Sequence, residues 1–166
     1  ANIASAVRTA KIRTIVSSRA FIEKAELGDL VTAIDGTGAK ILWLEEVRET
    51  ISTQEKLEAA LLWSRRLHPV KPEDAAVILF TSGSEGTPKG VVLSHCNLHS
   101  NAAQADARVT ISVKDTLFNV LPVFHSFGLT GGTILPLLFG VRLFLYPSPL
   151  HFKQIPQIAA KVKPTI

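Results

Sequence analysis

The feature that most constrains the fold is an apolar run that ends directly in a glycine-rich loop. Residues 75–80 read AAVILF, and residues 80–90 read FTSGSEGTPKG. A short, fully apolar run is typical of a strand buried on both faces of a parallel sheet. Glycines after such a strand permit positive φ angles and the close approach of another group to the backbone. The sequence therefore predicts a strand followed by a candidate binding loop.

The other segments alternate between helical and extended patterns. We expect helices over 4–11, 18–29, 53–66, 94–108, 128–139 and 155–162, and strands over 13–17, 40–44, 75–80, 91–93, 116–121 and 141–146. Ser52 and Glu55 form a predicted capping box, Ser94 is a predicted N-cap, and the proline-containing segment 67–74 is a predicted linker. This alternation predicts an α/β fold with a largely parallel sheet flanked by helices.

The composition indicates a packed domain and favours a reducing compartment. The 166 residues are 46% hydrophobic and 19% charged, which excludes a disordered chain. The single cysteine excludes an internal disulfide and favours a reducing compartment. The chain has no methionine and begins with Ala1, which we interpret as a piece of a longer protein.

The positive charge is concentrated in the part of the chain that holds the loop. Residues 1–74 carry 11 basic and 11 acidic side chains, whereas residues 75–166 carry 7 basic and 3 acidic, the source of the net +4. This excess suits an anionic small molecule. Without a basic cluster or aromatic ladder, we expect no nucleic-acid partner. The longest apolar stretch, 129–141, falls short of the roughly 20 residues of a spanning helix, so we expect no membrane span.

The loop combines every group that a phosphate-binding loop needs. Convergent backbone N–H groups, hydroxyls and a lysine hold anions in such loops. The candidate residues are Thr81, Ser82, Gly83, Ser84, Gly86, Thr87, Lys89 and Gly90. A hairpin turn with a solvated tip is the alternative, because glycine, serine and proline are also common in turns.

Two widespread phosphate loops do not fit this sequence. The Walker A pattern fails because Gly83 and Gly86 are only three positions apart and Lys89 follows a proline. The dinucleotide pattern G-x-G-x-x-G fails because Glu85 and Pro88 occupy the other two glycine positions.

Two motifs carry a resemblance to a known family. Residues 81–90 resemble the signature [ST]-S-G-[ST]-T-G-x-P-K-G of the adenylate-forming superfamily, and 93–97 (LSHCN) resemble its continuation. Residues 121–128 (LPVFHSFG) resemble the family segment P-x-F-H-x-x-G. The superfamily includes acyl-CoA synthetases, firefly luciferase and the adenylation domains of peptide synthetases. The resemblance implies part of a large N-terminal AMP-binding domain, with 1–70 as the α/β segment before the loop and 75–166 as the phosphate-loop and acyl-site segment.

The resemblance also implies a reaction. A fatty carboxylate attacks the α-phosphate of ATP to give an acyl-adenylate, and a thiol then takes the acyl group. Lys89 and His125 are the implied catalytic residues, His125, Ser126, Phe127 and Gly128 the implied substrate-binding residues, and Mg²⁺ bridges the phosphates. Without the family, a lone histidine after an apolar strand would be interpreted as a satisfied buried residue. The family's metal-binding acidic residue lies outside this sequence, so we expect no metal ligand within it.

A narrower resemblance concerns Glu85, where the superfamily usually has threonine, together with 124–130 and 145–151 (LYPSPLH). These residues resemble the synthetase half of bacterial bifunctional 2-acylglycerophosphoethanolamine acyltransferases/acyl-acyl-carrier-protein synthetases. That implies long-chain fatty acids, acyl carrier protein as acceptor, a link to phospholipid repair, and a cytoplasmic domain of a parent attached to the inner membrane.

Three other hypotheses stay open. They are a long-chain acyl-CoA ligase, a non-catalytic nucleotide-binding α/β module, and a lipid-handling or interaction module with a structural glycine loop. The family's later adenine, ribose and C-terminal lysine motifs do not occur in residues 1–166. We therefore expect this piece alone not to catalyse adenylation.

Overall fold

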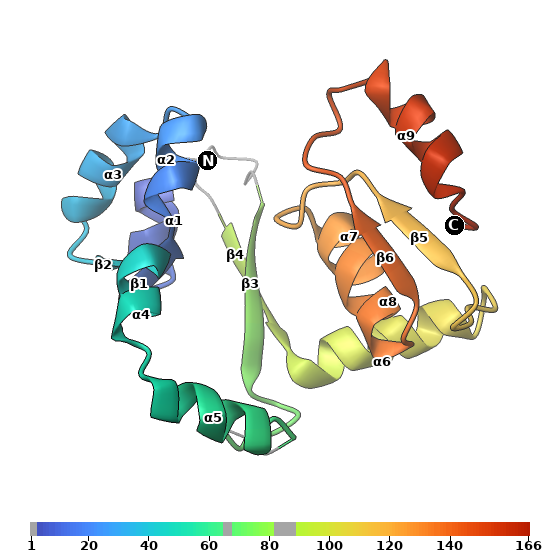
Figure 1. Ribbon diagram of the computed structural model, residues 1–166, viewed down its shortest axis with the longest axis horizontal. Helices are drawn as coiled ribbons and strands as arrows, with labels where there is room; N and C mark the ends of the chain where they lie inside the picture. The colour runs from blue at the N-terminus through green and yellow to red at the C-terminus, as the bar shows by residue number, and fades with distance from the viewer. Residues whose placement is uncertain (1–2, 65–67, 82–88) are drawn as a thin grey trace. The chain divides into compact units, whose positions relative to one another are not determined.

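The computed structural model describes residues 3–64, 68–81 and 89–166 (Figure 1). The chain divides into two units, Ala1–Val70 with Phe80–Val91, and Lys71–Leu79 with Val92–Ile166. Parallel strand pairs and helices occur in both units, which confirms the predicted α/β class. Among the described helices, none is long and apolar enough to cross a membrane.

The first unit is built around one parallel strand pair. Its elements are α1 (Ile3–Thr9), β1 (Thr14–Ser17), α2 (Arg19–Lys24), α3 (Gly28–Asp35), β2 (Lys40–Trp43), α4 (Leu44–Thr50) and α5 (Thr53–Leu61). Strands β1 and β2 pair in register from Thr14↔Lys40 to Ser17↔Trp43. Helix α1 packs on α3, and a small core forms from Val7, Ile34 and Ala39.

The helices of this unit differ from the prediction in three places. The expected helix over 18–29 is two helices, because Glu26 adopts a left-handed φ of 53° between α2 and α3. Helix α4 escaped prediction because Trp43, at its N-cap, offers no capping side chain. Helix α5 has the predicted Ser52–Glu55 capping box but ends at Leu61, five residues earlier than expected.

Strand β3 (Ala75–Thr81) pairs with β4 (Lys89–Ser94) in a two-stranded sheet. The prediction that this apolar strand is buried on both faces is wrong for the chain as described. Its residues are either exposed or half-buried, none is fully buried, and Ile78 is 39% exposed. Within the described residues β3 has β4 as its only strand partner, whereas a central parallel strand is covered on both faces.

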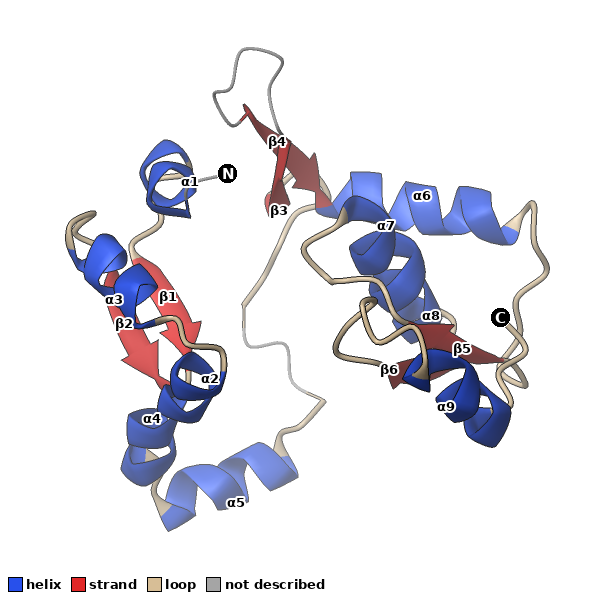
Figure 2. Cartoon of the chain, turned by 90° about the horizontal axis from the view of Figure 1, so that it is seen from above, coloured by secondary structure: helices blue, strands red, loops and turns tan. Residues whose placement is uncertain are grey.

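The second unit places a parallel pair between helices. Its elements after β4 are α6 (His95–Asp106), β5 (Thr116–Asn119), α7 (Ser126–Leu129), the π-helix η1 (Thr130–Ile134), α8 (Leu135–Leu138), β6 (Arg142–Leu145) and α9 (Gln154–Val162). Strands β5 and β6 pair from Thr116↔Arg142 to Asn119↔Leu145. Helix α9 lies on the opposite side of this pair from α7 and α8 (Figure 2). Helix α6 packs against η1.

The helix expected over 128–139 is interrupted in its winding. The chain is α-helical at α7, takes a π turn through η1, and returns to α-helix at α8. The N–H of Leu135 donates to the carbonyl of Thr130, five residues back, which is the bond of a π turn. Such single π turns are frequent at functional sites.

A reciprocal cap fixes the start of α6, as predicted for Ser94. The Ser94 hydroxyl accepts from the Asn97 N–H at 3.2 Å, and the Asn97 side-chain oxygen accepts from the Ser94 N–H at 2.9 Å. We expect Ser94→Ala to reduce the free energy of unfolding by about 1 kcal/mol, measured by chemical denaturation. Ser100→Ala on the same helix is the control, because its hydroxyl makes a long 3.8 Å contact with Cys96. An equal loss in both variants would contradict the capping role.

A carboxylate ties the start of β5 to the end of the chain. Asp115 accepts from the Ser112 N–H at 2.8 Å and from the Thr165 hydroxyl at 2.8 Å. The Ser112 backbone bond, followed by the Thr165 bond, lowers the pKa of Asp115. A carboxylate with a lowered folded-state pKa adds stability above its unfolded pKa, and that stability is lost as the pH falls through the folded value.

The same linkage gives a pH prediction for Asp115→Asn. We expect the variant to be less stable than the wild type at pH 7, and the gap to close as the pH falls below about 4. Denaturation midpoints of both proteins across this pH range measure the gap. A gap that stays constant from pH 7 to pH 3 would show that the ionised carboxylate contributes nothing.

Candidate functional site

The loop residues predicted to hold phosphates are described only at the ends of the loop. Ser82, Gly83, Ser84, Gly86 and Thr87 lie outside the described residues. Thr81 is the last residue of β3, Lys89 and Gly90 open β4, and all three are exposed. Because β3 and β4 pair, Thr81 and Lys89 lie at the same end of the pair, where residues 82–88 join the strands. The lysine is therefore accessible at the base of the predicted loop.

The second motif forms a turn that follows β5 and leads into α7. His125 stands at the N-cap of α7, where its Nδ1 accepts from the Phe127 N–H at 3.3 Å. The backbone N–H of His125 donates to the Pro122 carbonyl at 3.0 Å. The side chain is exposed, so the interpretation of His125 as a satisfied buried residue is wrong.

The cap also defines the chemistry of the imidazole. A neutral ring that accepts at Nδ1 carries its proton on Nε2. His125 in this arrangement offers Nε2–H as a hydrogen-bond donor to an incoming group. An oxygen of a carboxylate or a phosphate is a suitable acceptor.

A buried asparagine that the sequence did not single out holds both ends of this turn. Asn119, the last residue of β5, is 4% exposed. Its Oδ1 accepts from the Leu121 N–H at 2.9 Å, and its Nδ2 donates to the Gly128 carbonyl at 3.2 Å. The available signal was the period-two pattern of the strand, which puts this polar residue on the same face as buried Leu117.

Two glycines make the close approach of these segments possible. A Cβ at Gly128 would lie 2.2 Å from the Pro122 carbonyl oxygen, and a Cβ at Gly132 would lie 2.4 Å from Asn119 Nδ2. Neither position needs a positive φ, so glycine is required here by space alone. Gly128, predicted as a substrate-binding residue, is buried and supports the turn through its backbone.

Exposed aromatic side chains flank His125 in the sequence of the turn. Phe124 is 81% exposed and Phe127 is 65% exposed, and Ser126 is exposed between them. The turn thus presents an imidazole, a hydroxyl and two aromatic rings. This set is able to contact a molecule that joins a charged head to an apolar tail.

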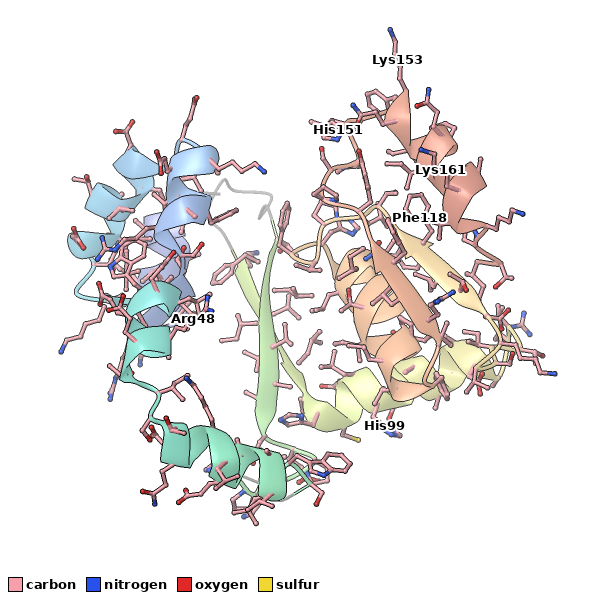
Figure 3. All side chains as sticks on the ribbon, in the orientation of Figure 1. Arg48, His99, Phe118, His151, Lys153 and Lys161 are labelled. Carbon is pink, nitrogen blue, oxygen red and sulfur yellow. The ribbon has the colours of Figure 1, made fainter. Side chains whose placement is uncertain are left out.

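The two candidate groups belong to different units. Thr81, Lys89 and Gly90 lie in the first unit and the His125 turn in the second, and each is described by itself. Within the described residues, no group of three His, Cys, Asp or Glu side chains is arranged to hold a metal ion. His99 lies on α6, whereas His151 lies in the segment before α9 (Figure 3). The Nδ1 of His151 lies 3.0 Å from the Tyr146 hydroxyl.

Comparisons with known proteins bear on both groups. The sequence model of the family described as AMP-binding enzyme matches residues 1–166. The chain is 38% identical over 102 residues to long chain acyl-CoA synthetase 6, peroxisomal, of Arabidopsis thaliana, covering 61% of the chain and 14% of that protein. It is 35% identical over 86 residues to the medium-chain-fatty-acid–[acyl-carrier-protein] ligase TtuA of Teredinibacter turnerae, covering 52% of the chain and 13% of that protein.

A solved structure extends the similarity to the fold. The fatty acyl-adenylate ligase from L. pneumophila, in complex with acyl adenylate and pyrophosphate, superimposes with a TM-score of 0.71 at 24% identity. The match covers 99% of this chain and 26% of that one. The chain thus spans about a quarter of that structure and less of the two relatives.

Proposed function

The chain belongs to the AMP-binding enzyme family, and from that premise we propose that it is part of a ligase that activates long-chain fatty acids as acyl-adenylates. The observation that carries the proposal is the pair of motifs at 81–90 and 121–128. Each presents an exposed side chain suited to oxyanions, Lys89 in one and His125 in the other. The two relatives named above are named for long-chain acyl groups in one case and medium-chain fatty acids in the other, which supports the activation of a fatty acid.

The proposed reaction has two steps. A carboxylate oxygen of the fatty acid forms a bond to the α-phosphorus of ATP, and the bond from that phosphorus to the bridging oxygen breaks, releasing pyrophosphate. A thiol sulfur then attacks the acyl carbon, its proton passes to solvent, and AMP leaves. Catalysis of such transfers rests mainly on positioning and on stabilising charge.

We assign the phosphate-binding role to the loop residues. Lys89 supplies a point charge for the β- and γ-phosphates, while the hydroxyls of Thr81, Ser82, Ser84 and Thr87 and the backbone at Gly83, Gly86 and Gly90 supply donors. Mg²⁺ would supply positive charge that offsets the negative charge of the phosphates. Its protein ligand would come from outside residues 1–166.

We assign the carboxylate end of the substrate to the His125 turn. The Nε2–H of His125 donates to the attacking carboxylate or to an α-phosphate oxygen, which offsets the charge that two anions bring together. Ser126 and Phe127 are exposed on the same turn and would contact the carboxylate end of the substrate, and the exposed Phe124 offers apolar contact to an acyl chain. Gly128 contributes by keeping the turn close to the Pro122 carbonyl.

Acyl carrier protein is the proposed acceptor thiol. The residues in its favour are Glu85 and the 145–151 segment, and the Teredinibacter relative is named as an acyl-carrier-protein ligase. Coenzyme A is the second candidate, because the Arabidopsis relative is named as an acyl-CoA synthetase. With acyl carrier protein as acceptor, the reaction would take place in a bacterial cytoplasm and supply acyl groups for phospholipid repair at the inner membrane.

Product analysis tests this proposal. The full-length protein that contains this chain is incubated with a long-chain fatty acid, ATP and Mg²⁺, and with either phosphopantetheinylated acyl carrier protein or coenzyme A. We expect acyl-carrier-protein thioester and AMP by mass spectrometry. Formation of acyl-CoA alone would transfer the assignment to the second candidate. ATP binding with no fatty-acid-dependent AMP formation would leave a non-catalytic nucleotide-binding module.

A further inference from the structure

We propose that Asn119 is a positioning residue that sets the orientation of His125 through the turn between them. The reactive role of His125 rests on the proposed function. We call the side-chain hydrogen bonds that Asn119 and Thr133 make to this turn the clamp, and these bonds are a property of the structure. Asn119 ends strand β5, at the carboxyl edge of a parallel pair. Ligands of α/β folds bind beyond this edge, so a residue here is well placed to shape a site.

The contacts of Asn119 require a side chain that donates and accepts at once. Leu121, which donates to Oδ1, begins the turn, and Gly128, which accepts from Nδ2, ends it. A carboxylate in this position would accept from the first but not donate to the second. A serine is shorter, and a leucine has neither group. The carboxamide is therefore specified by the two ends of the turn together.

The helix beneath the turn is shaped to receive this side chain. Gly132, in the π turn η1, leaves the space that Asn119 fills, since a Cβ there would lie 2.4 Å from Nδ2. The next residue, Thr133, donates its hydroxyl to the same Gly128 carbonyl at 2.9 Å. The Gly128 carbonyl thus receives two side-chain bonds, one from the strand and one from the helix.

This clamp bears directly on the imidazole. His125 lies inside the clamped segment, and its ring is held by the Phe127 N–H on Nδ1. Loss of either clamp bond would let the turn move and release the Nδ1 lone pair. The orientation of Nε2–H would then no longer be fixed. Asn119 acts on the substrate only through this chain of contacts.

The opposite face of the strand pair is occupied by other contacts. Phe118, between Leu117 and Asn119, packs its ring 5.4 Å from Phe144 and 6.2 Å from Tyr146, and Figure 3 labels it on β5. A substitution at Asn119 therefore affects the face of β5 that contacts η1 and leaves the ring contacts of Phe118 in place.

Chemical modification of the full-length protein tests the clamp without requiring activity. Diethyl pyrocarbonate acylates the ring nitrogen that carries the free lone pair of a neutral imidazole. Peptide mass spectrometry follows the rate of this modification at His125, with the exposed His99 as internal reference. We expect Asn119→Ala to raise the rate at His125 about fivefold, the effect of one lost hydrogen bond. Thr133→Val removes the other side-chain bond to the Gly128 carbonyl and should raise the modification rate at His125 by a smaller factor. This second variant keeps the proposal testable if Asn119→Ala fails to fold. Ser94→Ala destabilises the same unit elsewhere and should leave the rate unchanged.

A double-mutant cycle then tests the link to His125 in catalysis. In fatty-acid-dependent pyrophosphate exchange, we expect Asn119→Ala to lower kcat and leave the KM for ATP unchanged. In the His125→Ala background the same change should have no further effect, because interacting residues are not additive. An unchanged modification rate in both clamp variants, or additive losses in the cycle, would overturn the proposal. Absence of exchange in the wild type, with the modification pattern as expected, would remove the proposed function and keep the clamp.

Discussion

Replacement of Lys89 by alanine is expected to lower fatty-acid-dependent pyrophosphate exchange by the full-length protein about a hundredfold or more. Lys89 is exposed at the first position of β4, where the chain leaves the predicted phosphate loop. In the proposed reaction, its ammonium group stabilises charge on the phosphates as pyrophosphate departs. Removal of one preorganised donor from such a site typically costs two to three orders of magnitude in kcat.

A matched variant separates this role from a general effect of lost positive charge. Lys40 is also an exposed lysine at the first position of a strand, β2, in the same unit. Lys40→Ala should leave the exchange rate within twofold of the wild type, because surface charges away from a site contribute little. Full exchange by Lys89→Ala would favour a structural glycine loop. Equal losses in both variants would indicate an effect of net charge.

The largest expected effect on stability is that of Gly128→Ala. The added Cβ would lie 2.2 Å from the carbonyl oxygen of Pro122 and 2.9 Å from its carbon, both of which are backbone atoms that cannot rotate away. Overpacking of this kind costs typically 1–3 kcal/mol and occasionally more, and we expect about 3 kcal/mol here. The turn that carries His125 would have to separate from α7.

Hydrogen exchange in the full-length protein measures this effect locally. We expect backbone amides of residues 121–133 to exchange faster in Gly128→Ala, because the free energy of local opening becomes smaller there. Gly28→Ala is the control: an added Cβ at Gly28 meets nothing within 4 Å, and no positive φ opposes it. Unchanged exchange across 121–133 in Gly128→Ala would contradict the tight contact between the turn and α7.

Signals that act over a few residues allowed correct prediction of several elements. The capping boxes of Ser52 with Glu55 and of Ser94 with Asn97 lie within four consecutive residues, and both mark helix starts in the structure. Of the two, the sequence predicted the first in full and the second at Ser94. The parallel pairing of β1 with β2 and of β5 with β6 follows from the alternation of strands and helices.

The features that escaped prediction depend on contacts between separate elements. The role of Asn119 depends on its contact with Gly128 and on the space at Gly132, which folding brings together. Helix α4 lacks a capping side chain at Trp43, and the break after α2 depends on the backbone angle of Glu26. The exposure of β3 follows from its pairing with β4 alone among the described strands.

We propose that this chain belongs to an enzyme that joins fatty acids to AMP. Fatty-acid-dependent exchange of labelled pyrophosphate into ATP tests it most directly, with the full-length protein and residues 1–166 assayed in parallel over several acyl chain lengths. We predict exchange in the full-length protein that requires a long-chain fatty acid, and none in residues 1–166 alone. Absence of exchange in the full-length protein at every chain length would show that the protein does not activate fatty acids, and would leave the loop as a binding or structural feature.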